Sequence, residues 1–213
     1  MKEPCRIAAA LLLDAGLPLE RAPLSQREAV STMLRTGFHC VRASSVGRLF
    51  DGVYAVLSGR GEVSYEGQGA ALLEAMVQPG TEEQRYPLAF YEEEGIRWFD
   101  YRPMIRGIEE DLDHQIPAAA IAGGFMDALC RMALEQCVAL NPNRMPVVLS
   151  GGVFQNYYLL SKLVRLLREG GFQVFTHKNV SANDEGVCLG QLAIAQRRRE
   201  NHVFGCSAED NQD

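Results

Sequence analysis

The sequence predicts an α/β fold with a helical N-terminal portion, and three features indicate it. In roughly the first eighty residues, apolar side chains recur at helical spacing. The period then changes to that of two short strands joined by a glycine-containing loop. From Pro117 onwards the predicted order is helix, strand, helix, strand, helix, which is typical of parallel strands linked by helical crossovers.

The helical portion contains four predicted helices. Pro4 favours the start of the first, and Ser25-Gln26-Arg27-Glu28 has the pattern of a capping box for the second. A serine caps the third, and Pro79 follows the fourth. The predicted helices run from Pro4 to Asp14, from Ser25 to about Gly37, from Ser44 or Ser45 to Ser58, and from about Gly67 to Val77.

The second portion begins with a predicted hairpin and continues as alternating helices and strands. The loop Glu92-Glu93-Glu94-Gly95 separates the two hairpin strands. The predicted strands are Tyr86 to Tyr91, Ile96 to Tyr101, Pro146 to Ser150 and Phe172 to Thr176. The predicted helices start at Pro103, run from Pro117 to Leu140 and from Gln155 to Arg168, and end with Glu185 to about Arg199.

These elements divide the chain into three parts. Residues 1–82 form the helical portion, residues 83–199 form an α/β lobe, and residues 200–213 are polar, without a period, and are expected to be a frayed tail.

Composition excludes several classes of protein. A net charge of -6 and a pI of about 5.3 argue against a nucleic-acid-binding surface. No apolar run approaches the ~20 residues that span a bilayer, so no membrane segment is expected. The six cysteines form no C-x-x-C pair, which argues against a zinc ribbon and fits a reduced, cytoplasmic protein.

The stretch VVLSGGVFQN, residues 147–156, places two glycines where a strand ends and a helix begins. Gly151 and Gly152 either make a sharp turn or let a phosphate approach bare backbone N–H groups, because no Cβ stands in the way. Open α/β sheets bind ligands at the carboxyl ends of their strands, but the stretch is neither a full Walker motif nor a full G-x-G-x-x-G, so the turn is the simpler interpretation of these residues alone. Asn156 follows at the helix start, where it caps the helix or reaches a ligand.

Three further stretches are candidates. The loop from Ser181 to Gly186 also follows a strand and opens a helix, so we expect it at the same sheet edge as the glycines. In it, Asp184 is either a helix cap or a ligand for a hard metal ion. Asp51 lies one helical turn from Arg48, where an ion pair is the simpler interpretation, and Tyr65-Glu66-Gly67-Gln68 is a turn into a helix.

No catalytic residue can be assigned from the residues alone. The four histidines are scattered with no i, i+4 pair, and a metal site needs three or more ligands. Each histidine is most simply a surface or structural residue. No serine lies in a G-x-S-x-G stretch, and no cysteine and histidine follow a known nucleophile pattern.

Four separated motifs resemble one family in the right order. SGGVFQN, followed by NDEG and LGQLAIA, is similar to the C-terminal part of the HypF carbamoyltransferases, maturation proteins of nickel–iron hydrogenases. The resemblance extends upstream through SSVGRLFDGVYAVLSG, SYEGQGAALLEAM and the opening EPCRIAAALLL, and covers roughly residues 3 to 197. The tRNA threonylcarbamoyl-adenosine synthase family shares the fold but matches the motifs less well.

The resemblance implies the C-terminal half of the actin, sugar-kinase and Hsp70-like (ASKHA) nucleotide-binding fold. The implied ligands are ATP or carbamoyl-adenylate and a divalent metal ion. The implied reaction passes a carbamoyl group to the C-terminal cysteine of a partner hydrogenase maturation protein, on the way to a cyanide ligand of the hydrogenase iron. The residues implied at the nucleotide are Gly151, Gly152, Asn156, Asp51, Glu66 and Gly67, and the implied metal ligand is Asp184.

The sequence also departs from that family. The family's metal site uses a histidine pair spaced H-x-x-x-H, which is not in this sequence, and its usual N-D-G-G is N-D-E-G here, with Glu185 adding a charge. The acylphosphatase-like, zinc-finger and carbamoyl-adenylate-forming modules of full-length HypF proteins are not in this sequence either. We therefore expect half of a two-lobed transferase that needs a missing N-terminal lobe or the full-length HypF modules for activity.

An alternative function is a non-catalytic nucleotide-binding or interaction module, which would keep the glycine loops without turnover. In either case a lobe without its partner should expose apolar surface and favour self-association as a homo-oligomer.

Overall fold

The structure is a computed structural model that describes residues 3–78 and 85–203. The first stretch contains four helices joined by loops, as predicted, and the second combines helices with short strands. The α-helices are α1 (Pro4–Asp14), α2 (Arg27–Thr36), α3 (Val46–Ser58), α4 (Gln68–Met76), α5 (Arg102–Asp113), α6 (Ala118–Leu140), α7 (Tyr157–Glu169) and α8 (Val187–Val203). The strands are β1 (Ala89–Glu93), β2 (Ile96–Asp100), β3 (Val147–Leu149) and β4 (Val174–Thr176), and two short 3-10 helices are η1 (Gly152–Gln155) and η2 (Asp184–Gly186).

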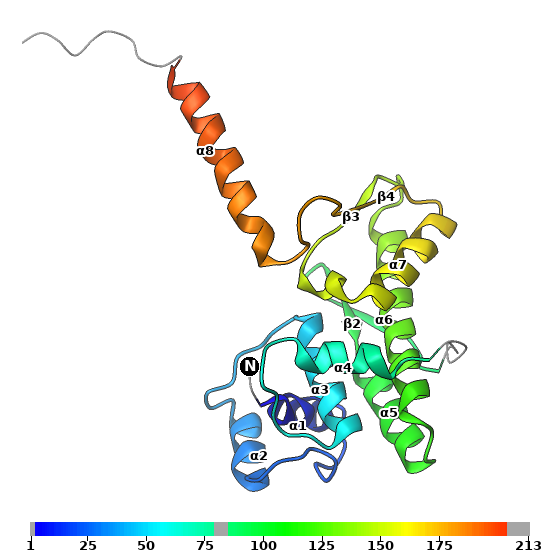
Figure 1. Cartoon of the computed structure of the whole chain (residues 1–213). Helices are drawn as coiled ribbons and strands as arrows, with labels where there is room; N and C mark the ends of the chain where they lie inside the picture. Colours follow the sequence, from blue (N-terminus) through cyan, green and yellow to red (C-terminus); the bar gives the residue numbers. More distant parts are fainter. Residues whose placement is uncertain (1–2, 79–84, 204–213) are drawn as a thin grey trace, which may run out of the picture.

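The N-terminal helices pack as a cluster beside the long helix α6, while α8 extends away from the body (Figure 1). α1 packs on α3, α3 on α4, α4 on α6, and α6 on α7. A single hydrophobic core follows these contacts, and in it the rings of Phe50 and Phe125 meet edge to face with centroids 5.1 Å apart. The core therefore joins the helical portion to the α/β portion. The predicted boundary at residue 82 lies outside the described residues.

The close approach of α1 and α3 depends on a glycine. A Cβ built on Gly52 of α3 would lie 2.4 Å from Cδ1 of Leu11 on α1. Any larger residue there would displace the Leu11 side chain or push the two helices apart, because the core is closely packed.

Two separate two-stranded sheets form among the described residues. β1 and β2 pair antiparallel as the predicted hairpin, with Ala89 opposite Asp100. β3 and β4 pair parallel, with Leu149 opposite Thr176, and α7 is the crossover between them. The prediction of parallel strands joined by a helix is therefore confirmed for this pair.

Some predicted boundaries are wrong. The capping box at Ser25 does not form, because α2 begins only at Arg27, with Gln26 at the N-cap and no side-chain cap. The first hairpin strand begins at Ala89, whereas Tyr86 is buried and its hydroxyl donates to Asp111. α8 continues to Val203, since no glycine or proline interrupts residues 200–203, so the predicted tail does not begin at 200. Residues 204–213 of that tail lie outside the described ones.

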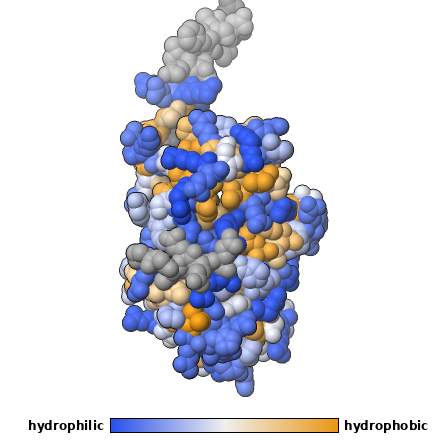
Figure 2. Space-filling model, turned by 90° about the vertical axis from the view of Figure 1, so that its right-hand side faces the viewer, coloured by the Kyte–Doolittle hydropathy of each residue, from blue (hydrophilic) through white to orange (hydrophobic). Residues whose placement is uncertain are grey.

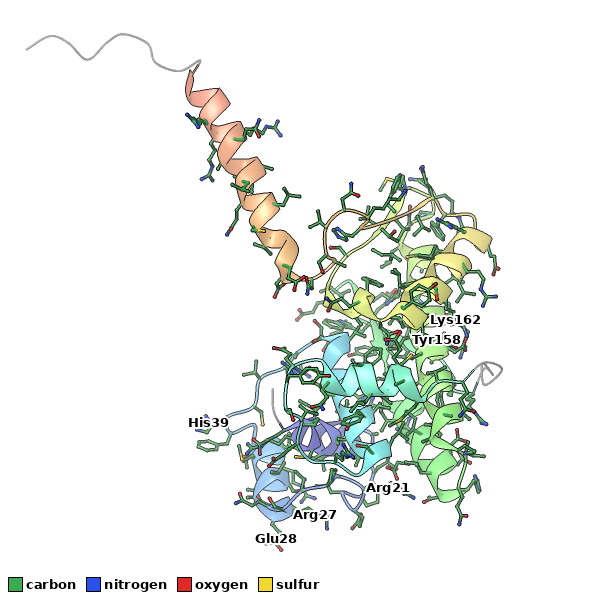
Figure 3. All side chains as sticks on the ribbon, viewed as in Figure 1. Arg21, Arg27, Glu28, His39, Tyr158 and Lys162 are labelled. Carbon is green, nitrogen blue, oxygen red and sulfur yellow. The ribbon has the colours of Figure 1, made fainter. Side chains whose placement is uncertain are left out.

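A buried carboxylate ties α7 to α6. Asp127 lies within the fully buried stretch of α6, and its Oδ1 is 2.9 Å from Nζ of Lys162 on α7. Its Oδ2 accepts a hydrogen bond of 2.6 Å from Nε of Arg131. The Asp127 and Lys162 side chains are each only 7% exposed, and Figure 3 shows Lys162 beside Tyr158 on α7. Two cations therefore compensate one desolvated anion.

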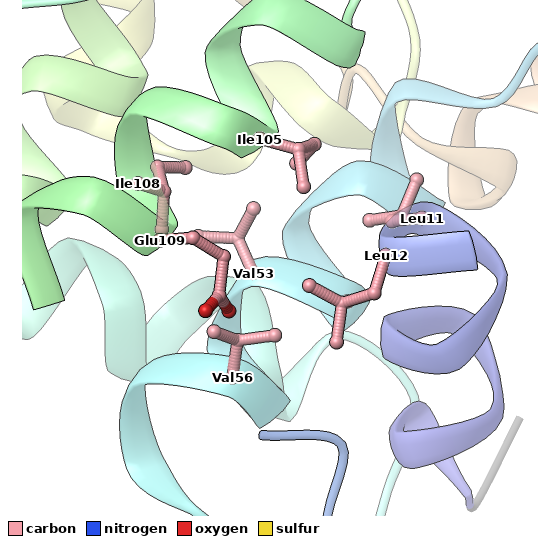
Figure 4. A pocket seen from close by; sticks show the side chains of 8 residues that line it. Leu11, Leu12, Val53, Val56, Ile105, Ile108 and Glu109 are labelled. Carbon is pink, nitrogen blue, oxygen red and sulfur yellow. The ribbon is translucent and has the colours of Figure 1, made fainter. Parts of the chain in front are cut away.

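A second carboxylate borders a small apolar cavity between α1, α3 and α5 (Figure 4). The cavity of about 10 Å³ has room for about one water molecule. Glu109 reaches it from α5, and its Oε2 accepts a hydrogen bond of 2.7 Å from Nε of Arg21. Its Oε1 is buried without a hydrogen-bond partner in the described part of the chain. Burial raises the pKa of Glu109, and the Arg21 cation opposes that rise.

We predict that Lys162→Ala lowers the free energy of unfolding by about 3 kcal/mol, because it leaves a buried carboxylate with one cation instead of two. Chemical denaturation measures the loss. Arg6→Ala is the control, since the Arg6–Glu3 pair is half exposed and its removal should cost under about 1 kcal/mol. Equal small losses for the two variants would contradict a structural role for the buried pair.

We also predict a pH dependence from Glu109. Its folded-state pKa is raised above the ordinary value of 4.5, so the folded protein binds more protons there than the unfolded chain. The free energy of unfolding therefore falls as the pH rises from the unfolded pKa through the folded one. Glu109→Gln removes this dependence, so its stability relative to the wild type should rise over that range in urea titrations. Glu110→Gln, an exposed neighbour, controls for the loss of one charge. Parallel curves for Glu109→Gln and the wild type would refute the assignment.

Candidate functional site

The first candidate loop leaves β3 through a backbone conformation that suits only glycine. After Leu149, the chain passes Ser150 and reaches Gly151, whose φ is +114°. A side chain at this φ is strained, although nothing lies within 4 Å of where its Cβ would be. A Cβ on Gly152 would meet only Cβ of Asn183 within that range, at 3.8 Å. The surface beside the two glycines is therefore open, as approach of a ligand to the backbone requires.

The second candidate loop lies against the first, as the parallel strands predict. The Gly151 N–H donates to the carbonyl of Ala182 across 2.8 Å. Asn183 caps η2 by accepting a hydrogen bond of 3.1 Å from the Glu185 N–H. The two loops that follow β3 and β4 therefore meet at the carboxyl edge of this sheet.

Asp184 is exposed at the start of η2, and the capping role that the sequence left open belongs to Asn183 instead. Asp184 is therefore available as a ligand, but the described residues contain no group of three or more His, Cys, Asp or Glu side chains arranged to hold a metal ion. The described residues therefore do not form a complete metal site around Asp184.

Two backbone donors in the first turn of α7 are already satisfied by side chains. Oδ1 of Asn156, a residue only 7% exposed, accepts a hydrogen bond of 2.8 Å from the Leu159 N–H. The Tyr158 N–H donates to Oε1 of Glu74 on α4 across 2.9 Å. Asn156 is thus the N-cap, and a carboxylate from α4 already lies at the positive end of α7. The Tyr158 and Leu159 N–H groups are therefore not free for a ligand, whereas the backbone of the glycine loop before the helix is open.

The remaining predicted residues lie on α3 and the turn into α4. Oδ2 of Asp51 is 3.0 Å from Nη1 of Arg48, the predicted ion pair, with the Asp51 side chain largely buried. Burial raises the pKa of Asp51, opposed by Arg48. Gly67 has a φ of +83° at the N-cap of α4, and Glu66 beside it is exposed. Asp51 and Glu66 are near enough to interact electrostatically, but the hydrogen bond of Asp51 goes to its own helix.

Sequence reasoning missed a contact between the two loops. Nε2 of His177, directly after β4, lies 2.9 Å from the Ser150 hydroxyl, directly after β3. A signal is present in the sequence, because both residues follow strands predicted to be parallel neighbours. The scattered spacing of the histidines instead favoured a surface or structural role for each of them.

Large apolar side chains are exposed around this site. Val187, Leu189, Leu192 and Ile194 of α8 are each more than half exposed. Val148 and Phe175, paired on β3 and β4, leave one face of their sheet bare, with exposures of 67% and 48%. Figure 2 shows the side of the molecule that lies to the right in Figure 1, and in its upper part apolar groups gather between hydrophilic ones. No helix among the described residues is long and apolar enough to cross a membrane.

Comparison with known proteins identifies the class to which this fold belongs. Residues 1–191 match the family described as "Carbamoyltransferase, Kae1-like Domain, second subdomain". A crystal structure of full-length HypF in its phosphate- and nucleotide-bound form superposes with a TM-score of 0.82 at 28% identity, covering 92% of this chain and 26% of that one.

The chain belongs to the HypF carbamoyltransferase family. It is 34% identical over 157 residues to carbamoyltransferase HypF of Synechocystis sp., which covers 74% of this chain and 20% of the relative. A carbamoyltransferase HypF homolog of Cupriavidus necator is 29% identical over 215 residues, covering 92% of this chain and 53% of that protein. The chain therefore spans between a fifth and about half of the length of these relatives.

We predict that Asn156→Ala lowers the free energy of unfolding by about 1 kcal/mol, because the Leu159 N–H loses its cap. Hydrogen exchange at the Leu159 amide should accelerate. Asn156→Asp keeps the accepting oxygen and should keep the slow exchange at the Leu159 amide. Unchanged exchange in Asn156→Ala would contradict the capping role.

Proposed function

We propose that this chain is the C-terminal lobe of a HypF-type carbamoyltransferase domain, which binds ATP or carbamoyl-adenylate at the glycine loop and works only together with an N-terminal lobe. The resemblance to the family implies that the acceptor of the carbamoyl group is the C-terminal cysteine of a hydrogenase maturation partner. We extend that acceptor to this chain as part of the proposal.

One observation carries the nucleotide site: the loops after β3 and β4 meet, with Gly151 and Gly152 open on their outer side. Backbone without side chains at the carboxyl edge of a parallel pair suits a phosphate. The phosphate- and nucleotide-bound state of the full-length HypF structure that this chain resembles supports this ligand class.

The predicted ligand residues differ in how well they suit their roles. Asn156 has both ends of its amide facing protein atoms, the Leu159 N–H and Sδ of Met126, so it would support the nucleotide by fixing α7. Asp51, Glu66 and Gly67 would face the ribose from α3 and α4. Asp184 fits as one ligand of a divalent metal ion whose other ligands come from elsewhere.

Exposed apolar surface and chain length both support a missing lobe. A protein of this size rarely leaves several large apolar side chains exposed on one half of a helix, as on residues 187–194 of α8, unless another body covers them. The Cupriavidus relative is about twice as long as this chain, as two lobes would require. The alternative, a non-catalytic nucleotide-binding or interaction module, would retain the loops without transfer.

We predict that this chain binds ATP with magnesium and that Gly151→Val weakens the affinity at least about tenfold, or about 1.4 kcal/mol. The reason is that valine does not tolerate a φ of +114° and covers the open backbone. Isothermal titration calorimetry provides the measurement. Gly16→Val is the matched control, since Gly16 also has a positive φ, +75°, and open space but lies at the end of α1.

The two alternatives are separated by repeating the titration, together with an assay of carbamoyl transfer, after the upstream part of a HypF relative is added as a separate chain. Carbamoyl transfer that appears only in the mixture supports the half-enzyme. Nucleotide binding without transfer in the mixture supports the non-catalytic module. A wild type and a Gly151→Val variant with equal affinity would refute the glycine-loop site in both.

A further inference from the structure

The contact between His177 and Ser150 extends the β3–β4 pairing beyond its last backbone partners. Leu149 and Thr176 form the final register pair, and the next residue on each strand supplies one member of the 2.9 Å side-chain contact. Each strand has only three residues, so few backbone bonds hold the glycine loop in place. The hydrogen bond from the Gly151 N–H to the Ala182 carbonyl is the next tie along the loop.

We propose that His177 is a positioning residue for a phosphate subsite, in which it orients the Ser150 hydroxyl toward the anion. This proposal rests on the proposed nucleotide site and adds to it the group that donates from a side chain. Ser150 is exposed and precedes Gly151 directly, so its hydroxyl lies beside the open backbone of the loop.

The chemistry of the pair selects one arrangement. A serine hydroxyl has one proton, and an ionised phosphate only accepts hydrogen bonds. If Ser150 donated its proton to His177, it would present only lone pairs to the phosphate. Anion binding therefore requires Nε2–H of His177 to donate to Ser150 Oγ, which leaves the hydroxyl proton free for the ligand. The pair then acts as one donor, because the imidazole fixes the rotamer of the hydroxyl that makes the contact.

This dependence gives a double-mutant cycle with a definite outcome. In the full chain, titrated with inorganic phosphate and with ATP and magnesium, Ser150→Ala and His177→Ala should each weaken binding, Ser150→Ala on the order of tenfold because a hydrogen bond to a charged group is lost. The double variant should bind no more weakly than Ser150→Ala alone, since His177 acts only through that hydroxyl.

Two conservative variants separate positioning from simple loop support. His177→Gln supplies an amide N–H and should recover most of the affinity lost in His177→Ala. His177→Glu only accepts hydrogen bonds, adds a negative charge, and should recover none. Nitrogen-15 spectra of the histidine ring provide a direct readout, in which the wild type with phosphate should show the proton on Nε2.

These experiments distinguish failure of the proposed role of His177 from failure of the nucleotide site itself. If neither probe binds the wild type, alone or mixed with an upstream HypF lobe, both the proposed site and this inference are overturned. If binding depends on Gly151 but the Ser150 and His177 losses add, or if the ring carries its proton on Nδ1 alone, the inference is overturned and the nucleotide site stands.

Discussion

The position of the candidate site depends on a carboxylate buried away from it. Asp127 lies among apolar residues of α6, where an unpaired charge would be strongly destabilising, so Lys162 of α7 must lie against it. The same carboxylate holds Arg131, whose Nη2 also donates to the Tyr86 carbonyl just before the hairpin. α7 is thereby fixed on α6, and the glycine loop that leads into α7 is fixed with it.

The carboxylate of Glu74 changes how the N-terminus of α7 can be interpreted. From sequence, the positive end of the helix after Gly152 is an obvious place for a phosphate. In the structure Glu74 of α4 occupies that position, and Asn156 takes the next donor. The protein has therefore used the helix terminus to join α4 to α7. The open backbone of the glycine loop and the exposed Ser150 hydroxyl then remain as candidate contacts for a ligand. Glycine at 151 then serves both the turn and the open surface, so the two interpretations left open by the sequence do not compete.

Local patterns predicted the elements, but not the contacts that assemble the site. The apolar run Val147-Val148-Leu149 between Pro146 and the glycines indicates a short strand, and its parallel partner follows from the helix between them. By contrast, the contacts that assemble the site join residues far apart in the sequence, and no periodicity relates the partners. These contacts are Glu74 with Tyr158 and Ser150 with His177. Two cap predictions were wrong for a smaller reason, whereas the cap at Asn156 is confirmed. The position of a cap depends on which residue turns first, and that differed by one residue at Asp184 and by one at Ser25.

The distribution of apolar residues around α8 bears on what covers it. At 100° per residue, Val187 and Ile194 lie on one side of the helix, whereas Leu189 and Leu192 lie on the opposite side. A symmetric pair of α8 helices from two copies would bury one side and leave the other in water. To bury both sides, α8 has to lie between two apolar surfaces. The exposed face of Val148 and Phe175 provides only one such surface. The N-terminal half of α8 is apolar on both sides, as is normal for an interior helix, whereas its C-terminal half is polar and includes Arg197, Arg198 and Arg199. Self-association alone therefore leaves half of this surface unexplained, whereas a second lobe that closes against both the helix and the sheet accounts for all of it.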